Sequence, residues 1–109
     1  MVSPVAGTVQ NLVTSKEIGS NYFVWAHGDG DKLVTASPAL LVGIFCNATF
    51  TGATNVEDGA TDAGTVVITL PNGFAAGTYY DLHSIKMDDG IFIDDGSSAG
   101  TMVVLWRYQ

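Results

Sequence analysis

The sequence predicts a single all-β domain, an antiparallel β-sandwich or jelly-roll-like barrel of about seven to nine short strands. Three observations predict it. Short apolar and β-branched runs recur along the chain, Gly- and Asp-rich turns separate them, and no stretch shows the 3.6-residue period of a helix. The 109 residues suffice for one domain. An immunoglobulin-like sandwich without its disulfide is the alternative.

The first residues read as a segment distinct from the sandwich. We expect 1–19 to form an N-terminal arm or edge strand and 20–109 to form the sandwich domain. Val5, Val9 and Val13 are too widely spaced for a helix face, so the segment is weakly extended. Such a strand pairs readily with the sheet edge of a neighbouring chain. These three valines are therefore interface candidates.

Two short strands are expected next. The aromatic and β-branched run 22–27 is typical of a pleated sheet. The sequence Gly-Asp-Gly-Asp at 28–31 supplies turn residues, and 32–36 resumes an extended run. We expect the two runs to be strands joined by this tight loop.

The longest apolar run, 39–50, predicts a central strand. Its residues are apolar on both faces, so both faces are expected to leave water. The alternation assigns Leu40, Val42, Ile44 and Cys46 to one face and Leu41 and Phe45 to the other.

Five further strands follow, at 55–57, 65–70, 78–87, 91–93 and 101–108. In the second of these, Val66, Ile68 and Leu70 are expected to face inward. The last strand is apolar on both faces, which predicts cover on both sides and a docked C-terminus.

Composition limits the function classes. Eleven acidic and four basic side chains give a net charge of −7, and Lys16, Lys32, Lys86 and Arg107 are scattered, so no nucleic-acid partner is expected. No apolar stretch approaches the ~20 residues of a membrane span, so no membrane partner is expected. Cys46 has no partner for an internal disulfide, as in a protein folded in a reducing cytosol. The 47% hydrophobic content indicates apolar surface that faces a partner.

No catalytic set and no cofactor are predicted. The sequence 96–100 matches G-x-S-x-G around Ser98, but that motif requires a strand-to-helix turn. His27 and His83 show no sign of a catalytic role. Paired aspartates in loops make weak cation-site candidates, because Asp-Gly is also ordinary β-turn sequence. These cation candidates are Asp29, Asp31, Asp94 and Asp95.

The aromatic residues allow two interpretations. At strand spacing they pack in a core or between subunits, and if several reach the surface together they form a platform that stacks on sugars. Tyr22, Trp25 and Tyr79 are the interface candidates among them.

The later part of the chain, 41–108, resembles small all-β virion proteins of tailed bacteriophages, of the capsid decoration, cement or head-fibre kind. The resemblance lies in 43–47, Gly52, the Asp58-Gly59 turn, 63–68, 90–93 and 100–104. It implies a non-enzymatic structural protein, made in the host cytoplasm and located in the virion. It also implies a homotrimer that contacts the major capsid protein or another virion protein. The alternative function is a carbohydrate-binding β-sandwich, for example at a phage fibre tip.

Overall fold

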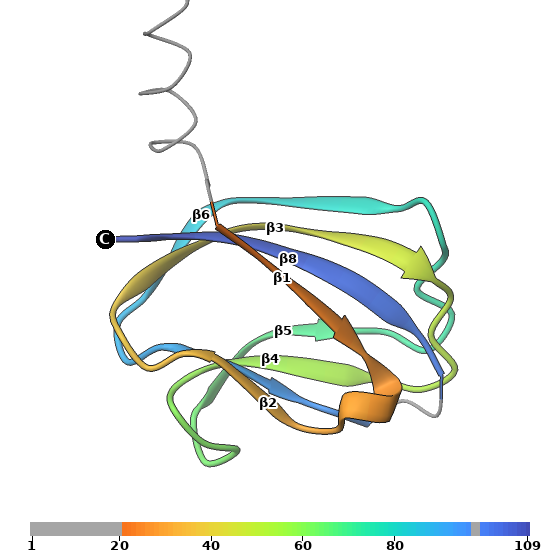
Figure 1. The fold of residues 1–109 in the computed structure, drawn as a ribbon, viewed down its shortest axis with the longest axis horizontal. Helices are drawn as coiled ribbons and strands as arrows, with labels where there is room; N and C mark the ends of the chain where they lie inside the picture. The colour runs from red at the N-terminus through yellow and green to blue at the C-terminus, as the bar shows by residue number, and fades with distance from the viewer. Residues whose placement is uncertain (1–20, 97–98) are drawn as a thin grey trace, which may run out of the picture.

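A computed structural model describes residues 21–96 and 99–109, which form two four-stranded antiparallel sheets packed face to face (Figure 1). Sheet A contains, in spatial order, β1 (Asn21–Ala26), β8 (Thr101–Tyr108), β3 (Ala39–Ala48) and β6 (Tyr79–Met87). Sheet B contains β2 (Lys32–Thr35), β7 (Ile91–Asp94), β4 (Thr54–Asp58) and β5 (Thr65–Leu70). A 3₁₀ turn, η1 (His27–Asp29), follows β1. The predicted all-β sandwich is confirmed.

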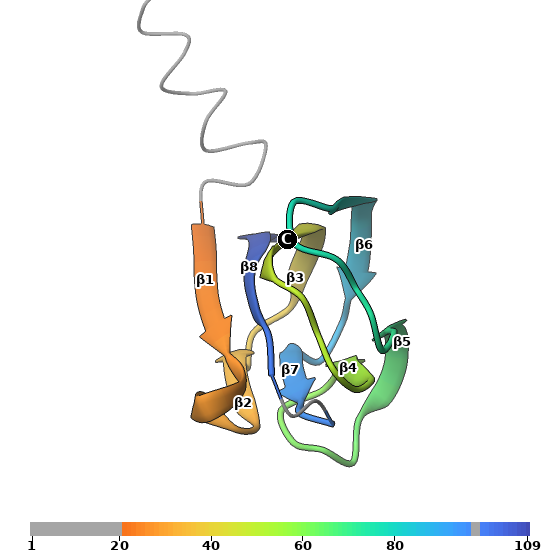
Figure 2. The same cartoon turned by 90° about the vertical axis from the view of Figure 1, so that its right-hand side faces the viewer.

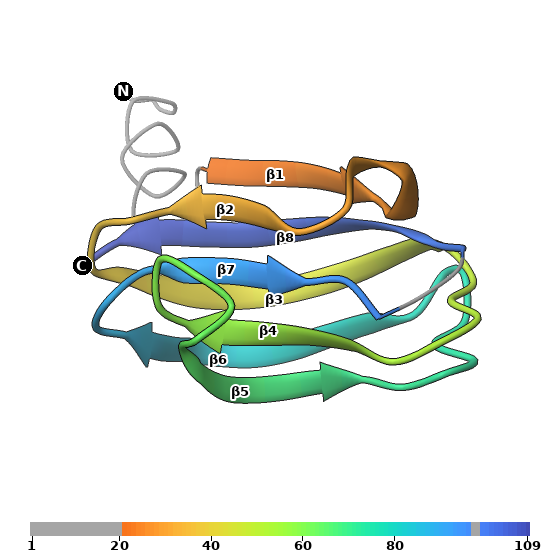
Figure 3. The same ribbon diagram turned by 90° about the horizontal axis from the view of Figure 1, so that it is seen from below.

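The strand order is that of a jelly roll. β1 pairs with β8, β2 with β7, β3 with β6 and β4 with β5, so the chain resembles one long hairpin wrapped into two sheets. Figure 2 shows the two layers from one end, and Figure 3 shows sheet B in front of sheet A. An immunoglobulin constant-type sandwich has sheets of four and three strands in another order, so that alternative is wrong. The sheets stay open rather than closing into a barrel.

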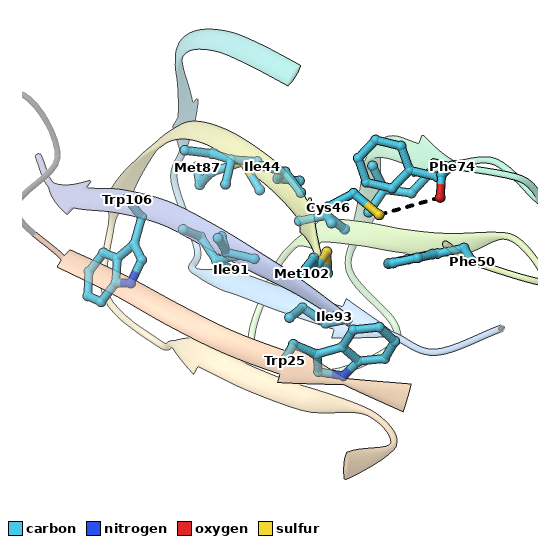
Figure 4. Packing of buried hydrophobic residues seen from close by; sticks show 14 of the residues in the cluster. Trp25, Ile44, Cys46, Phe50, Phe74, Met87, Ile91, Ile93, Met102 and Trp106 are labelled. Atoms are coloured by element: carbon cyan, nitrogen blue, oxygen red, sulfur yellow. Dashed lines mark hydrogen bonds between the residues drawn. The ribbon is translucent and has the colours of Figure 1, made fainter. Parts of the chain in front are cut away.

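The core lies between the sheets and is dense in aromatic rings (Figure 4). Phe50 lies 5.7 Å from Trp25 and 5.3 Å from Phe74 between ring centroids. The Cys46 thiol donates to the Phe74 carbonyl oxygen at 3.4 Å, and burial raises the pKa of this thiol. Cys46 is therefore a packing residue, as apolar surroundings make a thiol unreactive.

Two bulges reverse the predicted side-chain alternation. In β3 the register shifts between Leu41 and Gly43, so Leu41 and Ile44 both lie in the core. In the β4–β5 pair the shift at Val56 and Glu57 leaves Val66 48% exposed. The predicted shared face of Leu40 with Ile44 and the predicted inward position of Val66 are wrong. One extra residue in a strand moves every later side chain to the other face.

A third irregularity distorts β6, which is an edge strand of sheet A. His83 and Ser84 have φ of 54° and 58°, in the left-handed region that non-glycine residues rarely adopt. The Asp81 carboxylate accepts a hydrogen bond from the His83 N–H at 3.0 Å. A bulge of this kind disrupts an open edge and protects it from pairing with another chain.

Candidate interaction surface

The outer face of sheet A carries a continuous apolar row across all four strands. Val24 on β1 lies opposite Val103 on β8. Val103 lies opposite Phe45 on β3, and Phe45 lies opposite Tyr79 on β6. Since Trp25, Val104 and Ile44 next to them point into the core, these four side chains point outward.

A second row runs beside the first. Tyr22 lies opposite Leu105, Leu105 opposite Gly43, and Gly43 opposite Asp81. We call the two rows together the sheet A face; its members are Tyr22, Val24, Gly43, Phe45, Tyr79, Asp81, Val103 and Leu105.

Much of the sheet A face is in contact with solvent. Tyr22 is 69% exposed, Val24 52%, Tyr79 44% and Phe45 36%. No described strand covers this face (Figures 1 and 2). The outer face of a solvated antiparallel sheet is normally polar, so adjacent exposed apolar rows are typical of an interaction site.

The Tyr79 side chain lies over Gly43, which has no side chain that would displace it. The Tyr79 hydroxyl and ring lie over Gly43, where a Cβ atom would collide with them. Burial raises the pKa of Tyr79, and the Asp81 carboxylate raises it further. Gly43 thus fixes an aromatic surface at the β6 side of the sheet A face.

A basic row borders the sheet A face at one end. Leu40 lies opposite Arg107 on one side and opposite Lys86 on the other. Within residues 21–96 and 99–109, neither cation forms an ion pair with a carboxylate. The Arg107 Nε–H is buried, and none of the described residues accepts a hydrogen bond from it. Two of the chain's four cations therefore flank one residue and form no ion pair in the described part of the chain, whereas their positions in the sequence are scattered.

The carboxylates lie elsewhere. Ten of them are in the described residues, and only Asp81 is on a sheet A strand. The other nine lie on sheet B strands or in the loops next to them: Asp29, Asp31, Glu57, Asp58, Asp62, Asp88, Asp89, Asp94 and Asp95. Most of the described carboxylates thus lie on the sheet B side, while Asp88 and Asp89 lie in the loop that joins β6 of sheet A to β7 of sheet B.

Sheet B contains a buried carboxyl group, that of Glu57, next to the half-buried Asp94, which the sequence did not predict. Glu57 is 2% exposed, and its Oε1 has no hydrogen-bond partner. Burial raises the pKa of Glu57, and a hydrogen bond with the Asp94 carboxyl and the charge of Asp62 raise it further. Two carboxyl groups share a hydrogen bond only when one holds a proton. The β4–β7 register is regular through Val56 and Glu57, so their side chains point to opposite faces of sheet B, and the burial of Glu57 gives no signal in the sequence.

The four cation candidates do not converge. The Asp31 carboxylate accepts from the Asp95 N–H at 2.8 Å, and the Asp95 carboxylate lies 3.0 Å from His27 Nδ1. Asp29 accepts from the Ala26 N–H at 3.1 Å, and Asp94 pairs with Glu57. In the described part of the chain, no three His, Cys, Asp or Glu residues are placed to hold a metal ion. These aspartates tie loops together.

The interface candidates have different outcomes. Tyr22 and Tyr79 lie on the sheet A face, as an interface requires. Trp25 is fully buried and its indole N–H donates to the Gly30 carbonyl at 2.8 Å, so its prediction as an interface side chain is wrong. Val5, Val9 and Val13 lie outside the described residues, as does Ser98.

The fold and the site together define a jelly-roll β-sandwich with one uncovered apolar sheet face. No protein-family model, no curated protein and no solved structure matches the chain. No pocket is formed by the residues that the structure describes. None of these residues forms a helix long and apolar enough to span a membrane.

Proposed function

We propose that this chain is a non-enzymatic structural virion protein that decorates or cements a phage capsid through the sheet A face. The observation that carries the proposal is this face, which is apolar across four strands and bears four large side chains between 36% and 69% exposed. The partner is the major capsid protein or another virion protein.

The central strands support an interaction on this side. β3 and β8 are apolar on both faces, and the fold buries only the inner one. Val103 and Leu105 on β8 are half-buried, and Phe45 on β3 is exposed. Covering this face with a partner would remove the apolar side chains from water at roughly 25 cal/mol per Å² of buried apolar area.

The fold is compatible with this role. Jelly-roll double sheets occur in viral capsid domains, although they also occur in lectins and cupins. Since a fold alone does not define a function, the proposal rests on the sheet A face and on the resemblance to phage virion proteins. The same resemblance makes a homotrimer the proposed state in the virion, after synthesis in the host cytoplasm.

Co-sedimentation with phage capsids tests the proposal. The full-length protein is mixed with purified tailed-phage capsids that lack surface decoration, and the pelleted fraction is measured. We expect saturable binding, and light scattering of the free protein should give a trimer. Protein that stays in the supernatant at every capsid concentration, across capsids of several tailed phages, would overturn the capsid role.

One observation favours carbohydrate binding as a second candidate. Tyr22 and Tyr79 are exposed aromatic rings on one sheet face, and such rings stack on sugars. On a glycan array this candidate predicts binding that Tyr22→Ala and Tyr79→Ala both abolish. An array without binding would leave the capsid role as the single candidate.

A further inference from the structure

We propose that the sheet A face binds a protein surface that is apolar in the middle and carries carboxylates at one edge, placed to meet Arg107 and Lys86. This inference rests on the proposed contact through the sheet A face and specifies the chemistry of the partner.

Arg107 and Lys86 form no ion pair within the described residues, although the protein is rich in acids. The described residues contain ten carboxylates, yet neither Arg107 nor Lys86 forms an ion pair with any of them. Both flank Leu40 at the border of the apolar rows. Cations at the rim of an apolar contact commonly fix its register and its choice of partner.

The Arg107 guanidinium has an unmet hydrogen-bond donor among the described residues. Its Nε–H is buried and has no acceptor there, and an unmet buried donor is unfavourable. A carboxylate accepts two parallel N–H bonds from a guanidinium, in a geometry that no other side chain matches. After a small side-chain movement, a partner carboxylate would satisfy this donor.

Distance and salt separate the sheet A face from most of the described carboxylates. Packed sheets lie about 10 Å apart, and the Debye length is about 8 Å at physiological ionic strength. An acidic edge in contact with Arg107 therefore experiences mainly Arg107, Lys86 and the nearest carboxylates, Asp88 and Asp89, which directly follow β6.

A second copy of the chain fits this face less well. Two sheet A faces packed together would bring four cations into the contact, while the described strands of each copy would supply one carboxylate, that of Asp81. Asp81 lies in the row of Gly43 and Leu105, next to the basic row on the same edge strand. Cations that lose water without a partner destabilise a contact.

A pair of charge-matched peptides tests the inference. One short synthetic peptide alternates Leu and Glu, and the other alternates Leu and Lys. Each is titrated into the full-length, isotope-labelled protein while NMR chemical shifts are recorded. We expect the Glu peptide to shift Val24, Val103 and Leu105 despite the negative protein, and the Lys peptide to act outside the sheet A face.

Charge-neutral variants make the test specific. The double variant Arg107→Gln and Lys86→Gln should bind the Glu peptide with an affinity about fivefold lower, or weaker still, than the wild type. Lys32→Gln, on β2 of sheet B, is the matched control and should leave its affinity unchanged.

Several results would overturn the inference. One is tighter binding of the Lys peptide than of the Glu peptide at the sheet A face. Another is a Glu-peptide affinity of the double variant equal to that of the wild type. A third is self-association of the free protein through this face. Capsid binding without Glu-peptide binding would refute the partner chemistry alone. Glu-peptide binding without capsid binding would support the chemistry and refute the capsid role.

Discussion

The outer faces of the two sheets differ in how their polar groups are used. On sheet A, Arg107 and Lys86 lie beside an apolar surface and form no ion pair with any carboxylate of the described residues. On the sheet B side, Asp58 accepts from the Asp88 and Asp89 N–H groups at 3.0 and 2.7 Å, and Asp31 accepts from Asp95. The acidic side chains on the sheet B side thus hold loops together, whereas the role proposed for Arg107 and Lys86, beside the sheet A face, is contact with another molecule.

The largest expected effect separates the two faces of β1. Trp25→Ala should lower the free energy of unfolding by about 3–5 kcal/mol, because it removes a fully buried ring from the core. Val24→Thr, one residue away on the sheet A face, should change it by less than about 0.5 kcal/mol. Urea denaturation measures both. Equal losses would mean that the outer side of β1 is structural rather than a contact surface.

The next effect concerns the buried carboxyl of sheet B. The pKa of Glu57 is raised in the folded protein, so protonation of this carboxyl stabilises the fold. The stabilisation is complete at pH values below the ordinary Glu pKa of about 4.3. This stabilisation is lost as the pH rises through the higher folded pKa. Glu57→Gln should therefore be more stable than the wild type at pH 8, by about 1–2 kcal/mol, with a difference that shrinks toward pH 4.

Urea denaturation across this pH range tests the Glu57 prediction. Asp81→Asn, on the sheet A side, serves as the control and should show no such pH-dependent gain. A difference between wild type and Glu57→Gln that is constant with pH would show that the carboxyl does not take up a proton on folding.

A smaller effect tests how the sheet A face is built. Gly43→Ala should displace the Tyr79 ring and lower the stability by about 1 kcal/mol. The pKa of Tyr79 should fall toward its ordinary value, which absorbance titration of the phenol measures. Gly28→Ala, where an added Cβ meets no atom within 4 Å, is the control. An unchanged Tyr79 titration in Gly43→Ala would contradict the proposed packing.

The smallest effect lies at the bulge of β6. His83→Gly should stabilise the protein by about 0.5–1 kcal/mol, because glycine adopts a φ of 54° without strain. His83→Ala removes the same exposed imidazole but keeps the strained backbone, so it should give no gain. Thermal unfolding compares the two. Equal melting temperatures would mean that the backbone stores no strain at this bulge.

The sequence predicted the strands well because composition and turn residues mark them locally. The run 65–70 is β5, and the expected strands at 22–27 and 101–108 correspond to β1 and β8 within one residue at each end. Apolar alternation and Gly-Asp turns depend on nearby residues alone, and a single chain displays them fully.

The faces of the strands were harder to predict because they depend on register between distant segments. The bulge in β3 reversed the assignment of Ile44 relative to Leu40, and the bulge opposite Val66 exposed that residue. Glu57 read as an ordinary strand residue, since its burial against Asp94 requires the pairing of β4 with β7. The apolar residues of β3 and β8 indicated cover on both sides, but their sequence could not show which side the fold leaves open.

A matched pair of charge substitutions tests the role of the sheet A face most directly. Val24 on β1 and Val66 on β5 are both valines on edge strands, 52% and 48% exposed, and they lie on opposite outer faces. In capsid co-sedimentation, Val24→Asp should abolish binding and Val66→Asp should leave it intact. Binding that survives Val24→Asp and is lost in Val66→Asp would place the contact on sheet B and contradict the account.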